Sequence, residues 1–163
     1  MRSIALKYLP ERLTPKDKRL QKRMLLKSRR LYKRGKYYTR KRIASYPSSK
    51  SPHVTKAMRM YGLDSIAPSK ALAAATGCSL SAQKQIVRKG AGAYYSSGSR
   101  PSQTAESWGI ARLASALTGG KAAAVDYAIL EKGCAPGGKA MQLAKKAKGK
   151  HGFGTRRVAK VAH

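Results

Sequence analysis

The stretch TPKDKRLQKRMLLKSRRLYKRG, residues 14–35, indicates the fold class of this chain. Thr14 can cap a helix, Pro15 suits the first turn, and Asp17 places an acid three residues after the cap. Apolar residues then recur at helical spacing until the glycine that closes the stretch, which is a natural helix end. This pattern predicts a helix over residues 15–34. Its narrow apolar stripe consists of Leu20, Met24, Leu31 and Tyr32.

Cations occupy most of the remaining positions of this helix. The whole chain of 163 residues has 36 Lys and Arg against six Asp and Glu, a formal net charge of +30. Self-repulsion on this scale opposes a compact isolated state, and a polyanion would relieve it. We therefore expect a negatively charged partner, with nucleic acid first and an acidic protein or membrane surface as alternatives. The candidate contacts on this helix are Arg23, Lys27, Arg30, Lys33 and Arg34.

Helix start and stop residues recur along the rest of the chain, with little strand signal. Residues 36–43 are basic and aromatic and could be extended, and residues 46–50 have the composition of a linker. The fold class predicted is mainly α. The further helices are expected to run from Ser51 to Gly62, from Pro68 or Ser69 to Gly77, from Ser79 or Ser81 to Gly90, from Ser102 or Thr104 to Gly119, and from Lys121 to about Glu131.

Composition predicts three parts. Residues 1–50 form a basic N-terminal arm with its helix, and residues 51–132 form a small multi-helix core. Residues 133–163 are a basic Gly/Ala/Lys tail with no acid, which is typical of a segment that is disordered or ordered by a partner. The candidate partner contacts in this extended tail are Lys145, Lys146, Lys148 and Arg156.

Cys78 and Cys134 lie far apart without the spacing of a metal site. We expect neither a disulfide nor a zinc site, which suits a reducing compartment. No apolar run reaches the roughly 18–20 residues that a membrane span needs, and the first ten residues lack the apolar stretch of a signal peptide. The chain is therefore expected to be made in the cytoplasm as a soluble protein, neither secreted nor membrane-spanning.

Residues 71–90, ALAAATGCSLSAQKQIVRKG, resemble a helix-turn-helix. Gly77 falls in the turn, and Ser79 or Ser81 would begin a recognition helix. Gln83 departs from the pattern, because an apolar residue is expected there. The alternative is a short αα-hairpin with glycine in its turn. Candidate nucleic-acid contacts on the second helix are Lys84, Arg88 and Lys89.

Residues 90–101, GAGAYYSSGSRP, are expected to form a flexible loop that makes a specific contact. Tyr94 and Tyr95 could stack on unpaired bases, and Arg100 could bind phosphate. In the alternative interpretation, the two tyrosines pack beneath a tight loop and Arg100 is bonded to nearby carbonyls.

Residues 118–121, TGGK, suggest a phosphate loop but depart from that pattern at Ser115 and Ala122. A helix end that leads into the next helix is favoured, with a simple anion contact at Lys121 as the alternative. The three histidines and six acids form no catalytic or metal-binding arrangement. We therefore expect no enzyme activity, no metal and no cofactor.

The combined motif AYYSSGSRP, SWG, ARLAS and TGGK, within residues 93–121, is long and specific. It resembles an uncharacterised family of small basic domains from large double-stranded DNA viruses and some tailed phages. The resemblance covers roughly residues 70–134 and implies a viral protein packaged in the particle.

On that resemblance we expect a structural protein of the virion. It would be a minor capsid protein of the cement type, bridging capsid subunits and the anionic interior of a large icosahedral DNA virus. Viral DNA or an anionic inner membrane would face its basic segments. The alternative is a nucleic-acid-binding protein, either genome-condensing or of the ribosomal type with rRNA as its partner. A sequence-specific regulator that reads DNA through residues 71–90 is a third hypothesis.

Overall fold

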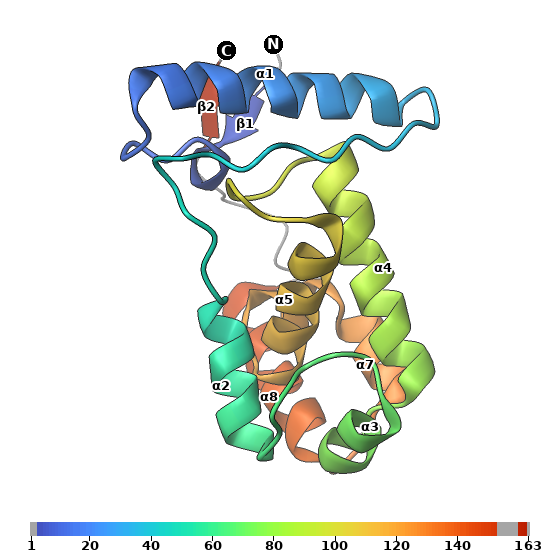
Figure 1. The fold of residues 1–163 in the computed structure, drawn as a ribbon. Coiled ribbons are helices and arrows are strands. Elements are labelled where there is room, and N and C mark those ends of the chain that lie inside the picture. The colour runs from blue at the N-terminus through green and yellow to red at the C-terminus, as the bar shows by residue number, and fades with distance from the viewer. Residues whose placement is uncertain (1–2, 153–159, 163) are drawn as a thin grey trace. The chain divides into compact units, whose positions relative to one another are not determined.

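The computed structural model describes residues 3–152 and 160–162. The fold is mainly helical, as predicted (Figure 1). Strand β1 (Ser3–Ala5) and a short 3-10 helix (Leu6–Tyr8) come first, and strand β2 (Lys160–Ala162) comes last. The helices between them are α1 (Pro15–Tyr32), α2 (Pro52–Tyr61), α3 (Lys70–Thr76), α4 (Leu80–Ser96), α5 (Ala105–Leu117), α6 (Lys121–Val125), α7 (Tyr127–Gly133) and α8 (Lys139–His151).

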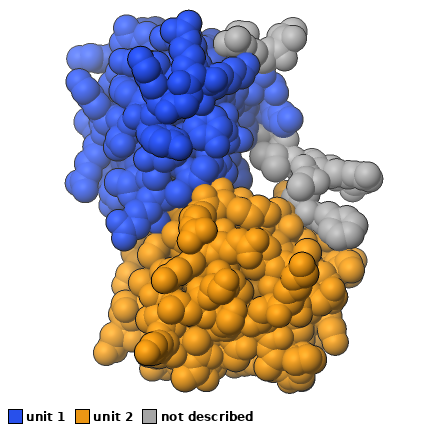
Figure 2. Space-filling view, turned by 90° about the vertical axis from the view of Figure 1, so that its right-hand side faces the viewer, with its two compact units in different colours: residues 1–49, 91–108, 157–163 blue, residues 50–90, 109–156 orange. Residues whose placement is uncertain are grey.

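The chain divides into two compact units, which Figure 2 colours separately. Unit 1 consists of residues 1–49, 91–108 and 157–163, and unit 2 consists of residues 50–90 and 109–156. The N-terminal segment is therefore part of a unit rather than an arm, because residues 91–108 and the C-terminal strand pack with it.

Helix α1 begins as predicted. The Thr14 hydroxyl accepts a hydrogen bond from the Asp17 N–H at 3.2 Å, so the cap that the sequence suggested is formed. The helix ends at Tyr32, two residues before the predicted end, and Gly35 turns the chain with φ at +72°. The chain then runs back along α1 without regular structure (Figure 1). The Lys41 N–H donates to the Met24 sulfur at 3.3 Å on this return path.

Strands β1 and β2 pair antiparallel, with Ser3 opposite Ala162. Two small apolar clusters stabilise unit 1, each including part of α1. Their buried members are Ile4, Leu9 and Leu25 in one cluster, and Leu13, Met24 and Ile43 in the other.

Helix α8 corrects the prediction of a disordered or partner-ordered tail for residues 139–151. Its alanines and Met141 recur at helical spacing and are buried in the main core of unit 2, where α8 packs on α6 and α7. Alanine has the highest helix propensity and allows close helix packing, so a segment of low apolar mass can still join a core. The buried residues of α8 are Ala140, Met141, Ala144 and Ala147.

Helix α4 does not end at Gly90, contrary to the prediction, and residues 90–96 are helical rather than a loop. Gly90 is instead the point where α4 meets α5. A Cβ atom at Gly90 would lie 2.6 Å from the Cα of Gly109. Two glycines are therefore needed for the close approach of the helices rather than for a helix end.

We expect the substitution Gly109→Ala to destabilise the protein by about 2 kcal/mol, because overpacked cores must shift backbone. The added Cβ would lie 2.5 Å from the Val87 carbonyl oxygen, which is a backbone atom. Urea unfolding measures the loss. Gly92→Ala, in the partner helix α4, is the control, since a Cβ there has open space. Equal stability of the two variants would contradict this account of the crossing.

The single helix predicted from Lys121 to about Glu131 is interrupted at Asp126, which separates α6 from α7. Asp126 is buried, and its carboxylate receives hydrogen bonds from Arg112 and Lys89. The break in the helix therefore coincides with a buried ion-pair network.

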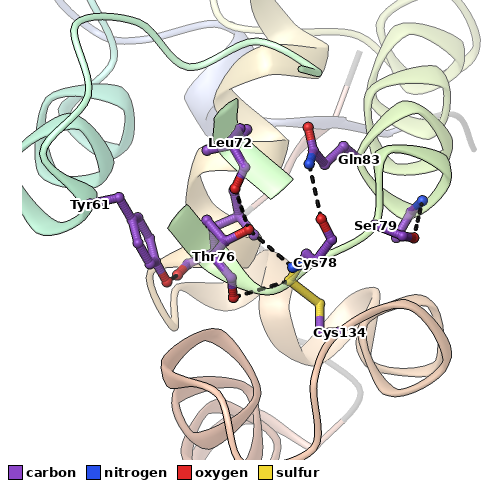
Figure 3. The surroundings of a disulfide bond; sticks show 9 residues. Tyr61, Leu72, Thr76, Cys78, Ser79, Gln83 and Cys134 are labelled. Carbon is purple, nitrogen blue, oxygen red and sulfur yellow. Dashed lines mark hydrogen bonds between the residues drawn. A yellow bond between two sulfur atoms is a disulfide. The ribbon is translucent and has the colours of Figure 1, made fainter. Parts of the chain in front are cut away.

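The expectation of two unpaired cysteines is wrong, because Cys78 and Cys134 form a disulfide (Figure 3). The turn after α3 lies antiparallel to the end of α7. The Ser79 N–H donates to the Gly133 carbonyl at 2.7 Å, and the Ala135 N–H donates to the Gly77 carbonyl at 2.9 Å. The two cysteines are 56 residues apart in sequence, so only the tertiary fold brings them together. The inference of a reducing compartment, which rested on unpaired cysteines, loses its basis.

Among the helices of the described residues, none combines the length and the apolar character that crossing a bilayer requires.

Candidate nucleic-acid interface

Helix α1 presents an uninterrupted row of exposed cations. Its members recur at spacings of three and four residues and fall within roughly 80° of arc, over about 21 Å of helix. Asp17, the acid of the helix, lies off this face, where its carboxylate accepts a hydrogen bond from the Ser45 hydroxyl at 2.6 Å. That hydrogen bond is the largest cause holding the pKa of Asp17 below its ordinary value. We define the cationic row as Lys16, Arg19, Arg23, Lys27 and Arg30.

The opposite side of α1 is fixed to unit 1 by polar contacts as well as apolar ones. The Ser28 hydroxyl donates to the Tyr95 carbonyl at 3.1 Å, and the Gln21 side-chain amide donates to the Tyr8 carbonyl at 3.2 Å. Arg29 donates to the carbonyls of Ser97 and Ser3. These contacts fix the rotation of the helix, so the cationic row faces solvent.

Most of the basic residues selected from the sequence on α1 are thus placed together. Arg23, Lys27 and Arg30 are exposed in the row, and Lys33 and Arg34 are exposed just beyond the end of the helix. Lys27 lies with its Nζ 4.5 Å from the Tyr38 ring centroid. Sequence analysis missed Lys16 and Arg19, although their spacing with Arg23 was a sufficient signal.

Tyr94 does not form a base-stacking site, contrary to the prediction. It is fully buried, and its hydroxyl accepts a hydrogen bond from the Arg40 N–H at 2.9 Å. Tyr94 is buried because it lies within α4 rather than in a loop, and its side chain points into unit 1. The alternative interpretation, in which this tyrosine is packed, is the correct one. Arg100, in contrast, is exposed.

Arg40 is a buried cation that sequence analysis did not single out. Its guanidinium lies 3.8 Å from the Tyr94 ring centroid and donates to the Tyr94 carbonyl and to the hydroxyls of Ser28 and Ser99. Burial lowers the pKa of Arg40 below its ordinary value. These neutral acceptors join α1, the return segment and residues 94–99, so Arg40 stabilises unit 1 rather than binding a ligand.

A row of tyrosines leads from this buried site to the surface. The Tyr95 ring is half-buried and lies 5.1 Å from the Tyr94 ring and 5.0 Å from the Tyr37 ring. The Tyr37 ring lies 6.2 Å from that of Tyr32. These are centroid distances within the range of ordinary aromatic pairs.

In unit 2, the predicted contacts on α4 have two different environments. Lys84 and Arg88 are exposed, whereas the Lys89 Nζ lies 2.8 Å from the buried carboxylate of Asp126. Arg112 binds the same carboxylate through its Nε and Nη2, both at 2.7 Å. Burial alone would raise the pKa of Asp126, but the hydrogen bonds from Arg112 and Lys89 outweigh it and hold the pKa below its ordinary value.

Helices α3 and α4 form a helix pair with Gly77 in a left-handed turn, a feature that the helix-turn-helix and the hairpin share. Gln83, the departure from the motif, is fully buried and satisfied. Its side-chain nitrogen donates to the Cys78 carbonyl at 3.0 Å (Figure 3), and its oxygen accepts from the Ser69 N–H at 2.9 Å. A polar residue at this position therefore closes the turn.

The remaining candidates lie in the second half of the chain. Residues 118–120 form the turn between α5 and α6, with Gly119 at φ +74°, and Lys121 begins α6, as the helix-end interpretation predicts. Lys121 is partly exposed there. On α8, Lys145 and Lys146 are exposed, and the Lys148 Nζ lies 4.3 Å from the Tyr127 ring centroid. Arg156 lies outside the described residues.

Among the residues that the structure describes, no three His, Cys, Asp or Glu side chains come together to hold a metal ion. The chemistry of the exposed face of α1 is instead that of a fixed array of cationic hydrogen-bond donors.

Comparison with known proteins places this chain in one family. Neither the curated proteins nor the solved structures contain a match. Residues 6–132, from the 3-10 helix to the last turn of α7, match a family of unknown function (DUF5824). This match covers most of the chain and includes both α1 and the motif of residues 93–121. The chain therefore belongs to the family of unknown function DUF5824.

Proposed function

We propose that this protein binds nucleic acid through the phosphate backbone, using the cationic row of α1. The observation that carries the proposal is the row itself, five exposed Lys and Arg side chains on one rigid face without an acid among them. On an ordinary protein surface, Lys and Arg side chains are mixed with Asp and Glu side chains. A continuous row of one sign instead matches the regular negative charge of a nucleic-acid backbone.

The chemistry of the row also suits phosphate. Three of its five members are arginines, whose planar guanidinium can donate two hydrogen bonds to one phosphate. The fixed rotation of α1 means that these side chains are presented together before the ligand arrives. Contacts of this kind bind the backbone and carry no sequence information.

We propose a virus particle as the setting of this activity, supported by the resemblance of residues 93–121 to the viral domain family. In that setting the viral genome is the polyanion, and the role is closer to genome binding than to capsid cement. The capsid-cement hypothesis assumed that the N-terminal arm and the C-terminal tail become ordered only when they contact partner proteins. Helices α1 and α8 pack on their own units instead, which weakens that support.

The test replaces three row residues with glutamine in one variant, Arg23→Gln, Lys27→Gln and Arg30→Gln. Each lost phosphate contact reduces the slope of log affinity against log salt by about 0.7–0.9. We expect the slope to fall by about 2 and the affinity for a 30-nucleotide DNA at 50 mM salt to fall about 100-fold. Fluorescence anisotropy over a salt series measures both.

The matched control carries Lys84→Gln, Arg88→Gln and Lys145→Gln, the same loss of charge on exposed sites of α4 and α8 in unit 2. It should retain most of the affinity. A larger loss in this control than in the row variant would assign binding to the exposed cations of unit 2 on α4 and α8. Wild-type protein that shows no affinity for DNA or RNA at low salt would end the proposal and leave the capsid-cement hypothesis.

A further inference from the structure

We propose that unit 1 holds single-stranded nucleic acid, with an unpaired base stacked on Tyr37 beyond the C-terminal end of α1. This inference rests on the proposed function and names its ligand class. It begins from an exposed ring. Tyr37 is 71% exposed, the highest value among the large hydrophobic residues that the structure describes.

The Tyr37 ring is exposed but held in place. It packs against the Tyr95 ring, which in turn meets the buried Tyr94 ring edge-on at 89°. The backbone before it is fixed as well, because the Gly35 N–H donates to the Tyr32 carbonyl and the Lys36 N–H donates to the Leu31 carbonyl, both at 2.9 Å. A ring that is supported from behind and open to solvent is a stacking platform.

The charged residues near Tyr37 in the sequence are all cations. The chain from residue 18 to residue 63 contains no Asp or Glu. Lys33, Arg34 and Lys36 precede the ring and are exposed, and they continue the charge of the cationic row past the end of α1. An apolar protein partner would have to cover these charges at a desolvation cost. A ligand that carries both phosphates and aromatic faces satisfies the charges and the ring together.

The exposed Tyr37 ring also favours single-stranded nucleic acid over a duplex. In a duplex the base faces are stacked on one another and are not available to a side chain. In a single strand every base offers a face, and aromatic stacking combined with a cationic track is the usual mode of sequence-independent binding. The row, the cations past its end and Tyr37 therefore fit a strand whose phosphates follow the exposed face of α1 and whose base reaches the ring beyond the last turn of the helix.

The experiment compares Tyr37→Ala with Tyr37→Phe, which keeps the ring. Stacking on one aromatic ring contributes roughly a 10-fold or larger factor in affinity by alanine substitution. We expect Tyr37→Ala to weaken binding of a 12-nucleotide single strand about 10-fold while duplex binding changes less than about 2-fold. Tyr37→Phe should bind both as the wild type does. Because the ring is largely exposed, Tyr37→Ala should lower the thermal stability only slightly, through the lost contact with Tyr95, and Tyr37→Phe should not change it.

An abasic single strand supplies the matched ligand control, since it keeps the phosphates and lacks the bases. Wild-type protein should prefer the normal strand to the abasic one, and Tyr37→Ala should lose this preference. DNA and RNA strands are both measured, because stacking does not depend on the sugar. If Tyr37→Ala keeps the preference while the row variant loses affinity, the stacking site is wrong and the proposed function stands. If no variant changes binding to any strand, both fail.

Discussion

Reduction of the Cys78–Cys134 disulfide is expected to lower the free energy of unfolding by about 4 kcal/mol, because the bond closes a long loop in the unfolded chain. The two cysteines are 56 residues apart in sequence. The disulfide also joins the turn after α3 to the end of α7, two segments that share an antiparallel backbone bridge. Urea unfolding with and without a reducing agent measures the difference.

The control for this experiment is the double variant Cys78→Ala, Cys134→Ala. Its stability should equal that of the reduced wild type and should not respond to the reducing agent. Both cysteines are buried, so alanine removes little more than the sulfur atoms. Native protein in which both thiols react with an alkylating reagent, without prior reduction, would show that the disulfide does not form.

Asp126→Asn is expected to destabilise the protein by about 3 kcal/mol at pH 7, at the lower end of the range for breaking a buried ion pair. The carboxylate is inaccessible, and it is the common partner of Arg112 and Lys89. Asparagine cannot neutralise either cation, so a partly buried guanidinium is left without its anion. The Lys89 side chain is 46% exposed and can return to water, which keeps the loss moderate.

The effect of Asp126 should depend on pH in one direction. Its pKa lies below the ordinary value of 3.8, so the folded state favours the charged form. This stabilisation is fully present above pH 3.8 and is lost as the pH falls through the lowered pKa. Wild type and Asp126→Asn should therefore converge in stability as the pH falls below that range. Glu131→Gln, an exposed acid on α7, is the matched control and should show no such convergence.

The features that sequence analysis predicted correctly are local ones. The start of α1 depends on Thr14 and Asp17, and the end of α2 depends on Gly62, whose φ is +64°. Caps of this kind act within one turn of helix, so neighbouring residues suffice to identify them. The exposed cations of α1 were predictable for the same reason, since their spacing alone places them on one face.

The features that were missed depend on residues distant in sequence. In the sequence, Gly90 is indistinguishable from a glycine that ends a helix. Only its close approach to Gly109 shows that α4 and α5 cross at this residue. Tyr94 and Tyr37 have similar sequence surroundings, rich in small or basic residues. Tertiary packing buries the first against Arg40 and leaves the second at the surface. No local pattern distinguishes these outcomes, because burial is decided by partners elsewhere in the chain.

The pairing of β1 with β2 bears on how the protein is made. Ser3 is synthesised 159 residues before its strand partner Ala162. At typical rates of translation the interval is roughly 8 to 30 s. For most of that time α1 has been synthesised, but the later segments of unit 1 have not. Pairing of β1 with β2 is therefore a late step in the formation of unit 1, and a polyanion near the site of synthesis meets the basic helix before the unit is complete.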